Sequence, residues 1–242
     1  MRLSRLVQEI CDIPGDFRIR LSSIEATEVT AELIAVMAGH PRKVCPHLHV
    51  CLQSGSDSVL RRMRRRWSVQ HIVDRCERVK QQLDRPALTT DVIVGFPAET
   101  DREFQETLET CRRIGFSKIH MFPFSPRRGT PAAEMVDQVS PGVKQERARL
   151  LAELETECRR NFAHALLGYR VRMMVEDIGE EFTLTGTTGR YLPAKLTLDS
   201  EPAAFLSGQV VEFEVAEVCN DVLCGSPPIC EAQRLPVAGV RN

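Results

Sequence analysis

The segment His47-Leu-His-Val-Cys-Leu-Gln-Ser-Gly-Ser-Asp57 decides the fold class of this chain. From His47 to Leu52 apolar and polar residues alternate, which predicts a strand with its leucines and valine on one face. The next residues form a polar loop around a glycine, and Asp57 is placed to cap a following helix. Together these features make a βα unit, and in parallel α/β sheets such loops hold ligands.

Three further units of the same kind flank this segment. Alternating strands are predicted at 17–21, 88–94 and 118–122, and amphipathic helices at 29–39, 69–79 and 101–114. Thr100 and Glu103 have the spacing of a capping box at the start of the last helix, and Gly115 is placed to end it. Four successive βα units predict an α/β fold with a parallel sheet, in the form of a partial, open barrel.

The pattern changes after a long helix predicted at 142–166, which Gly168 is placed to end. Short β-like segments follow at 171–175, 182–185, 191–198 and 210–218, separated by glycine and polar turns. This pattern predicts a small all-β barrel of OB-like size. We therefore expect two domains, an α/β domain over residues 1–166 and an all-β domain over residues 167–242.

The composition is that of a soluble globular protein, with 43% hydrophobic and 27% charged residues among 242. No apolar run approaches about 18 residues and the first residues are too polar for a signal peptide, so we expect a cytoplasmic protein without membrane attachment. The nine scattered cysteines favour reduced thiols. The net charge of −1 does not decide about nucleic acid, and the basic run from Arg61 to Arg66 has two interpretations, a solvated helix face or a phosphate contact.

Polar residues gather after each predicted strand. Because the carboxyl ends of parallel strands meet at one edge of a sheet, we expect these loops to form one ligand site there. Taken singly, Asp57 and Glu99 have a simpler explanation as helix-start carboxylates that interact with the helix dipole. The residues of the four loops are Ser22, Ser23 and Glu25; Gln53, Ser54, Ser56 and Asp57; Glu99; and Ser125, Arg127 and Arg128.

Cys45, His47, His49 and Cys51 alternate along one face of a predicted strand and are potential metal ligands. Neighbours on such a face lie about 6–7 Å apart, so at most two of them reach one ion without ligands from elsewhere. Packing in a barrel interior is the favoured interpretation, and the sequence alone assigns no metal site. A metal-dependent barrel enzyme that uses this face stays an alternative.

Four ordered motifs resemble those of the radical S-adenosylmethionine (SAM) methylthiotransferases: Ile19–Glu25, His49–Arg66, Thr90–Thr100 and Phe122–Pro131. The Leu-Ser-Ser-Ile-Glu sequence is most similar to the branch that acts on threonylcarbamoyladenosine beside the tRNA anticodon. The β segments after residue 168 resemble the TRAM domain. The resemblance implies transfer of a methylthio group to an adenine carbon, with tRNA as partner and with SAM and [4Fe–4S] clusters as cofactors.

The resemblance also implies which residues form the sites. Ser22, Ser23 and Glu25 would face the cofactor or the substrate base. Ala98 stands where the family usually has a second glycine, so that loop is expected to be reshaped. The other SAM-binding positions would be Gln53, Ser54, Ser56, Asp57, Val94, Gly95, Glu99, Phe122 and Pro123. The expected RNA contacts are Arg61, Arg62, Arg64, Arg65, Arg66, Arg127, Arg128, Arg170, Arg172 and Lys195.

One departure from the family is large. The Cys-x3-Cys-x2-Cys motif is absent, and none of the nine cysteines has its spacing. Because a cluster needs correctly placed thiolates, we expect that the family's cluster-binding N-terminal part is missing, that the chain is inactive alone, and that a separately encoded half would be its partner. Two alternatives are a non-catalytic RNA- or SAM-binding remnant, and a methylthiotransferase for isopentenyladenosine in tRNA or for a ribosomal protein.

Overall fold

The structure is a computed structural model that describes residues 2–198 and 207–226. It divides into two compact units, Met1–Phe162 and Ala163–Asn242. The predicted boundary at residue 166 differs from this division, which falls inside the last long helix. None of the helices in the described residues combines the length and the apolar character that a membrane span requires.

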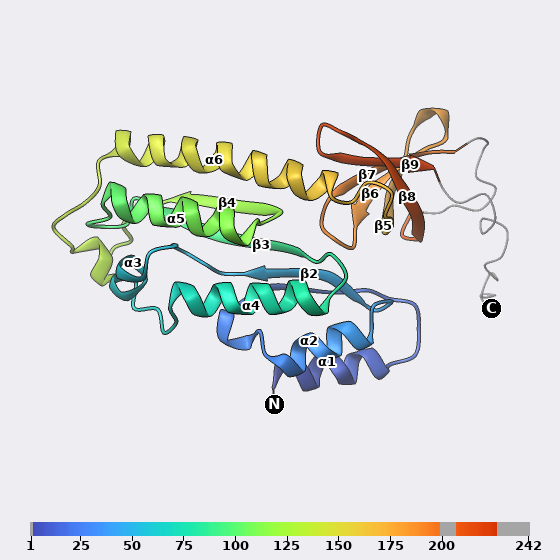
Figure 1. Ribbon diagram of the computed structural model, residues 1–242, viewed down its shortest axis with the longest axis horizontal. Helices are drawn as coiled ribbons and strands as arrows, with labels where there is room; N and C mark the ends of the chain where they lie inside the picture. Colours follow the sequence, from blue (N-terminus) through green and yellow to red (C-terminus); the bar gives the residue numbers. More distant parts are fainter. Residues whose placement is uncertain (1, 199–206, 227–242) are drawn as a thin grey trace. The chain divides into compact units, whose positions relative to one another are not determined.

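The first unit is built on a four-stranded parallel sheet in the order β1-β2-β3-β4 (Figure 1). The parallel pairing confirms the predicted α/β class. The strands are β1 (Ile19–Ile24), β2 (Val44–Val50), β3 (Ala87–Val94) and β4 (Lys118–Pro123). The helices are α1 (Leu3–Asp12), α2 (Ala31–Gly39), α3 (Asp57–Arg62), α4 (Val69–Gln82), α5 (Asp101–Ile114) and α6 (Pro141–His164), with short 3-10 turns η1 (Ala26–Glu28) and η2 (Pro131–Ala133).

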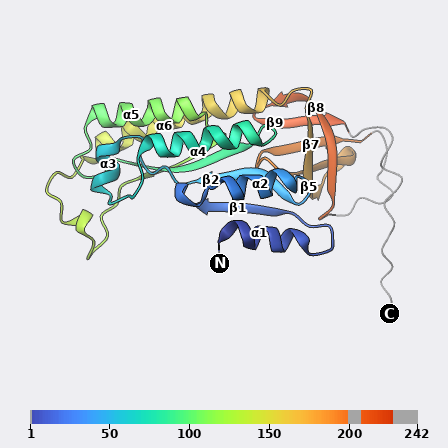
Figure 2. The same cartoon turned by 60° about the horizontal axis from the view of Figure 1, so that its bottom comes forward.

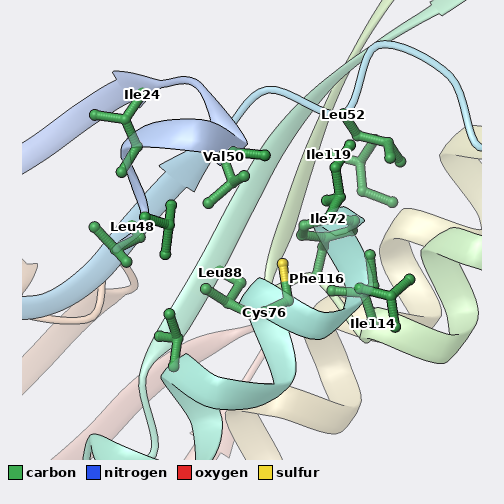
Figure 3. Packing of buried hydrophobic residues seen from close by; sticks show 14 of the residues in the cluster. Ile24, Leu48, Val50, Leu52, Ile72, Cys76, Leu88, Ile114, Phe116 and Ile119 are labelled. Carbon is green, nitrogen blue, oxygen red and sulfur yellow. The ribbon is translucent and has the colours of Figure 1, made fainter. Parts of the chain in front are cut away.

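The helices bury their apolar faces in one core against the sheet. Leu48, Val50 and Leu52 supply the sheet side of this core, and Ile72, Cys76 and Ile114 come from α4 and α5 (Figure 3). Figure 2 shows α4 beside α5, and these two helices contact each other, as do α1 and α2. Because strand side chains alternate between faces, His47 and His49 of β2 and Thr89 and Asp91 of β3 lie on the opposite face of the sheet.

The helix ends follow local sequence signals. Thr30, Ser68 and Thr100 each accept a hydrogen bond from the backbone N–H three residues later, at the starts of α2, α4 and α5. Thr100 and Glu103 form the predicted capping box, and Gly115 ends α5 with a φ of 62°. These side-chain caps satisfy donors that the first helical turn leaves open, which fixes the point where each loop of the sheet edge ends.

Three local predictions, two on strand ends and one on a helix start, were wrong. β1 runs on through Ser22 and Ser23 to Ile24, where a polar loop had been expected, because its backbone keeps pairing with β2 as far as Val50. β2 ends at Val50, two residues before the predicted end. Asp57 is the first residue of α3 and not its cap, and its carboxylate accepts a hydrogen bond from the backbone N–H of Val69 at 2.7 Å, which ties the start of α4 to that of α3.

The second unit is a closed barrel with strand order β5-β6-β7-β9-β8. Its strands are β5 (Arg170–Ile178), β6 (Thr183–Thr188), β7 (Pro193–Thr197), β8 (Val210–Cys219) and β9 (Val222–Ser226), with a 3-10 turn η3 (Glu180–Phe182). Buried side chains such as Val171, Phe213 and Leu223 fill its interior. A small barrel was predicted, but β9 was not, because its five residues carry little alternation.

Candidate cofactor and substrate site

The Gln53–Asp57 loop lies at the carboxyl end of β2 and is pinned to its surroundings. Gln53 has a φ of 68°, and its backbone exchanges hydrogen bonds with Asp91 and Ile93 of β3 at 2.8 and 2.9 Å. Ser54 is fully buried and its hydroxyl lies 3.3 Å from that of Thr107 on α5. The loop is therefore held on two sides, by β3 and by α5.

Gly55 makes the contact between this loop and α5. Its N–H donates to the Thr107 hydroxyl at 3.0 Å, and the Thr110 hydroxyl donates to its carbonyl at 3.2 Å. A Cβ at this position would lie 2.5 Å from the Thr107 Cα, so only glycine fits. Gly55, the glycine at the centre of the predicted loop, thus allows the loop to pack closely against α5.

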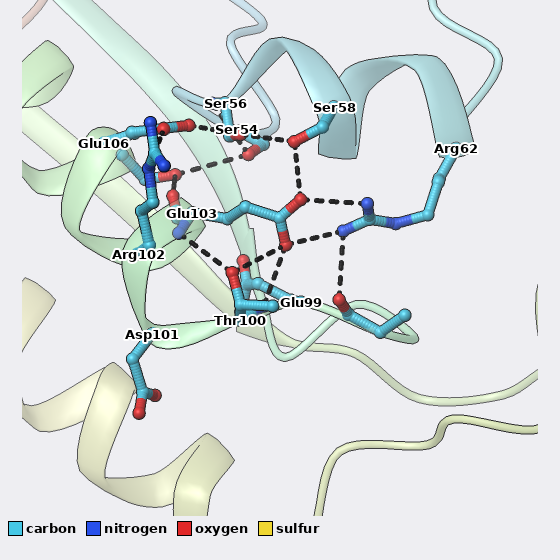
Figure 4. Close-up of polar contacts among 12 residues, drawn as sticks. Ser54, Ser56, Ser58, Arg62, Glu99, Thr100, Asp101, Arg102, Glu103 and Glu106 are labelled. Carbon is cyan, nitrogen blue, oxygen red and sulfur yellow. Dashed lines mark hydrogen bonds and ion pairs between the residues drawn. The ribbon is translucent and has the colours of Figure 1, made fainter.

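A polar network joins α3 to the start of α5 (Figure 4). The Arg62 guanidinium donates to both carboxylate oxygens of Glu103, at 2.9 and 2.8 Å, and Ser58 donates to the same carboxylate. The Ser56 hydroxyl donates to Glu106 at 2.6 Å. Chiefly through its hydrogen bonds with Arg62, Glu103 has its pKa lowered to about 2 and stays ionised.

This network changes the interpretation of two predicted site residues. Ser56 is buried and engaged with Glu106, and Arg62 is paired with Glu103 and also donates to the Ala98 carbonyl at 3.2 Å. Arg62 therefore differs from a phosphate contact on an open helix face, because its charge is already compensated within the protein. Neither residue follows from local sequence periodicity, since their partners lie more than forty positions away.

Glu99 is the buried anchor of the third loop. Its side chain is 1% exposed, and it accepts hydrogen bonds from the Gly95 N–H at 2.7 Å and from Arg147 of α6 at 2.8 Å. Burial raises the pKa of Glu99, while the Gly95 N–H and the Arg147 charge act in the opposite direction. Arg147 reaches on to Asp101 at 2.8 Å, so one guanidinium ties α6 to the loop and to α5.

Ala98 occupies the left-handed region with a φ of 60°. This conformation favours glycine and strains a residue with a Cβ by about 1–2 kcal/mol. The sequence led us to expect a reshaped loop at this alanine. The backbone instead keeps a conformation that is typical of glycine.

Ala98→Gly is expected to raise the free energy of unfolding by about 0.5–1 kcal/mol once the flexibility of glycine in the unfolded chain is subtracted. Urea denaturation checks this, and a decrease would contradict it.

The exposed part of the edge is formed by other predicted residues. Ser22, Ser23 and Glu25 are exposed at the end of β1, and Phe122 and Pro123 are exposed at the end of β4, with Phe122 at 52%. Val94 and Gly95 lie between these two ends at the close of β3, and both are buried. Asp57 and Ser125 are exposed as well, so the accessible groups at this edge are hydroxyls, carboxylates and one aromatic ring.

A hollow of about 290 Å³ opens beside Glu25. Arg64, Arg65, Arg66 and Trp67 line the rest of it. The Arg65 guanidinium lies 4.0 Å from the Glu25 carboxylate and 5.4 Å from the centre of the Trp67 ring. An aromatic ring among arginines is a combination that binds nucleotides through stacking and phosphate contacts.

The remaining basic candidates are spread over both units. Arg61 is exposed on α3, and Arg127 and Arg128 are exposed on the segment after β4. In the second unit Arg170 and Lys195 are exposed, on β5 and β7, while Arg172 is half-buried and has interactions within the protein. Of these candidates, Arg64, Arg65 and Arg66 line the hollow beside Glu25.

The sheet face opposite the helices carries several titratable residues, and the sequence analysis identified only some of them. His47 and His49 of β2 both contact the Thr89 hydroxyl, at 3.1 and 3.0 Å. Burial lowers the pKa of His47 to about 3, so its imidazole is neutral. Asp91 on β3 and His120 on β4 are register partners on this face and had not been singled out. The alternation of the 88–94 strand could have identified Thr89 and Asp91.

The described cysteines do not form a ligand set for an iron–sulfur cluster. Cys76 and Cys111 are buried in the helical core, and burial raises the pKa of Cys76 to about 12. Among the described residues, the one group of three potential metal ligands within reach of each other contains a single cysteine, Cys51. A [4Fe–4S] cluster bound through three thiolates does not fit these residues.

Comparison with known proteins agrees with this architecture. Residues 2–111 match the family described as the Radical SAM superfamily. Threonylcarbamoyladenosine tRNA methylthiotransferase MtaB of Thermotoga maritima is 39% identical over 216 residues, 89% of this chain and 48% of the relative. A tRNA-2-methylthio-N(6)-dimethylallyladenosine synthase of Mycobacterium marinum is 34% identical over 240 residues, 96% of this chain and 45% of the relative. The chain thus spans about half the length of the curated relatives it matches.

A solved structure shares the fold. Coproporphyrinogen III oxidase (HemN) from Escherichia coli, a radical SAM enzyme, matches with a TM-score of 0.51 at 17% identity, over 65% of this chain and 36% of that one. The parallel sheet with its polar edge is thus that of a radical SAM protein. Within this superfamily, the chain belongs to the methylthiotransferase family, with several of its most similar relatives in the threonylcarbamoyladenosine branch.

Proposed function

We propose that this chain supplies the SAM- and substrate-facing part of an enzyme that adds a methylthio group to N6-threonylcarbamoyladenosine in tRNA. The observation that carries the proposal is the 39% identity with the Thermotoga maritima relative, which extends over 89% of the chain and so takes in both units. When bound, SAM would supply the 5′-deoxyadenosyl group on which radical chemistry in this superfamily depends.

The exposed and the buried residues of the sheet edge have different roles in this proposal. Ser22, Ser23 and Glu25 offer hydroxyl and carboxylate groups to a ribose or an ammonium group, and the Phe122 ring offers an apolar surface to an adenine. Ser54, Ser56, Asp57 and Glu99 are positioning residues, because their side chains bond to other parts of the protein.

The tRNA would approach this edge over the hollow beside Glu25. Arg64 and Arg66 are exposed there, and the largely buried Trp67 lines the same hollow. In the second unit, Arg170 and Lys195 are exposed and would contact phosphates from the barrel surface. Barrels of this OB-like class bind oligonucleotides, which supports a second contact by that unit.

A binding experiment with two forms of one tRNA tests the substrate. The tRNA that carries threonylcarbamoyladenosine is expected to bind about 10-fold more tightly than the same tRNA with unmodified adenosine, because polar groups built to bind a substituent lose their partners without it. Electrophoretic mobility shift at fixed salt measures both affinities. Equal affinities would contradict the proposed substrate.

A double variant tests the location of the RNA contact. Arg64→Ala with Arg66→Ala is expected to weaken binding of both tRNAs and to lower the salt dependence by about two released counterions. The matched control is Arg2→Ala with Arg5→Ala, which removes two exposed arginines, one just before α1 and one in its first turn, and is expected to change little. An equal loss in both double variants would show only a general effect of charge.

A second substrate is favoured by a specific observation. The Mycobacterium marinum relative named for dimethylallyladenosine matches 96% of this chain, a larger share than the threonylcarbamoyladenosine relatives do. Competition between tRNAs that carry one or the other adenosine decides between them. Preferential binding of the dimethylallyl form would make this second substrate the correct one.

We also propose that these 242 residues do not cleave SAM by themselves. No Cys-x3-Cys-x2-Cys spacing occurs in the sequence, and the described cysteines are scattered through two units. Anaerobic reconstitution with iron and sulfide is expected to give no cluster absorption and no 5′-deoxyadenosine. A brown protein that releases 5′-deoxyadenosine would contradict this and would show that the scattered cysteines ligate a cluster.

A further inference from the structure

Three side chains with different donor atoms meet on the sheet face opposite the helices. His49 comes from β2, Cys51 follows the end of that strand, and Asp91 comes from β3. One nitrogen, one sulfur and one oxygen of these residues all lie within 4.8 Å of one another. The spacing along β2 allows only two ligands for one ion from that part of the chain. Asp91 of the neighbouring strand supplies the third.

The hydrogen bonds of His49 leave one ring nitrogen directed at this meeting point. Its Nδ1 lies 3.0 Å from the Thr89 hydroxyl, which also lies 3.1 Å from Nε2 of His47. The Thr89 hydroxyl has a single proton, so it donates to one of these two rings and accepts from the other. The Nε2 atom of His49 lies on the other side of the ring and faces the Asp91 carboxylate.

A ring nitrogen of His49 and a carboxylate oxygen of Asp91 thus lie opposite each other. The Nε2 atom of His49 is buried and makes no hydrogen bond among the described residues, although Oδ2 of Asp91 lies 3.3 Å away. A cation held between them would be coordinated by both atoms. Metal-bound histidines commonly hold the other ring nitrogen with an outer hydrogen-bonding partner, which is the part that Thr89 plays here.

We propose that His49, Cys51 and Asp91 form a binding site for a zinc ion. An imidazole nitrogen, a thiolate and a carboxylate are all zinc ligands, and three protein ligands leave a fourth position open. His120 is a further donor on the same face: its ring centre lies 5.8 Å from that of His49, and it pairs in register with Asp91. The mixed soft and hard ligands disfavour magnesium and calcium, which prefer oxygen alone.

The surroundings fit a site that takes up its ion from solution. Cys51 and Asp91 are half-buried, so the donors are accessible from one side. Zinc binds the thiolate form of cysteine, so uptake of the ion would release the Cys51 proton. The inference stands on these contacts and does not depend on the proposed tRNA substrate.

The test is zinc binding by the chelator-stripped full chain, measured with a competing chromophoric chelator. One equivalent is expected to bind, and Cys51→Ser or Asp91→Asn is expected to weaken it about 100-fold. The matched control is Cys219→Ser, because Cys219 and Cys224 interact with each other in the second unit and are the competing pair of soft ligands. Cobalt in place of zinc is expected to show a thiolate-to-metal charge-transfer band that Cys51→Ser abolishes and Cys219→Ser retains.

A measurement on the unaltered chain keeps the test valid if a variant does not fold. Zinc is expected to slow alkylation of Cys51 by N-ethylmaleimide at least 10-fold, as read by peptide mass spectrometry, while labelling of the exposed Cys219 stays unchanged. Absence of stoichiometric zinc, or labelling of Cys51 at the same rate with and without zinc, would overturn the proposal. Loss of binding in Cys219→Ser with retention in Cys51→Ser would do the same.

Discussion

Replacing Arg147 with methionine is expected to lower the free energy of unfolding of the first unit by about 3–5 kcal/mol, because it leaves the Glu99 carboxylate buried without its counter-ion. The Arg147 side chain is 6% exposed and that of Glu99 is 1% exposed. The same guanidinium donates to the Glu99 carbonyl at 3.1 Å and to Asp101. Chemical denaturation followed by the helical circular dichroism signal measures the change.

Two controls separate the buried pair from the general effect of removing an arginine. Arg149→Met lies one half-turn along α6, where the side chain forms exposed ion pairs with Glu146 and Glu153, and it is expected to change stability little. Adding Glu99→Gln to Arg147→Met is expected to recover a large part of the loss, because the amide oxygen still accepts from the Gly95 N–H. A loss below about 1 kcal/mol for Arg147→Met would contradict the assigned role.

Gly55→Ala is expected to lower the free energy of unfolding by about 2–3 kcal/mol, because the new methyl group would overlap the backbone of α5. The built Cβ lies 2.5 Å from the Thr107 Cα and 2.8 Å from the Thr110 Cβ, and backbone cannot move aside as a flexible side chain can. Relief requires the loop to lift from the helix and to lose its hydrogen bonds to both threonines. The same denaturation experiment measures this.

The matched control is Gly142→Ala in the first turn of α6. Nothing lies within 4 Å of a Cβ at that position, so the substitution is expected to be neutral or to stabilise by up to about 1 kcal/mol. If both variants lost the same stability, the effect at Gly55 would not come from contact with α5. A loop that lifts is also expected to weaken SAM binding, which a titration of the Gly55→Ala chain with SAM would show.

The elements of the first unit were predictable because their signals are local. Thr100 and Glu103 lie within one helical turn, and Gly115 needs only its own backbone conformation to end α5. The alternation of β2 likewise reports which of its side chains face the helices, whatever its partners are. The parallel order of the strands then follows from the repeated βα connection.

The chemistry of the sheet edge was predictable only in part because it depends on partners distant in sequence. Ser56, Asp57 and Glu99 were expected to face a ligand, yet each side chain bonds to a helix of its own unit. A serine beside a ligand and a serine beside Glu106 look alike in a linear sequence. Asp91 shows the converse, since its approach to His49 appears only when β2 and β3 are placed in register.

Trp67 has a consequence for experiments because it is the one tryptophan in the sequence. Its ring lies under the Arg65 guanidinium and borders the hollow beside Glu25, and it is 8% exposed. Tryptophan fluorescence, excited at wavelengths where the two tyrosines do not absorb, therefore originates at the sheet edge and not in the second unit. A base that stacked in the hollow would displace Arg65 and quench this emission, so an unlabelled chain would report optically which of its two units a nucleotide has reached.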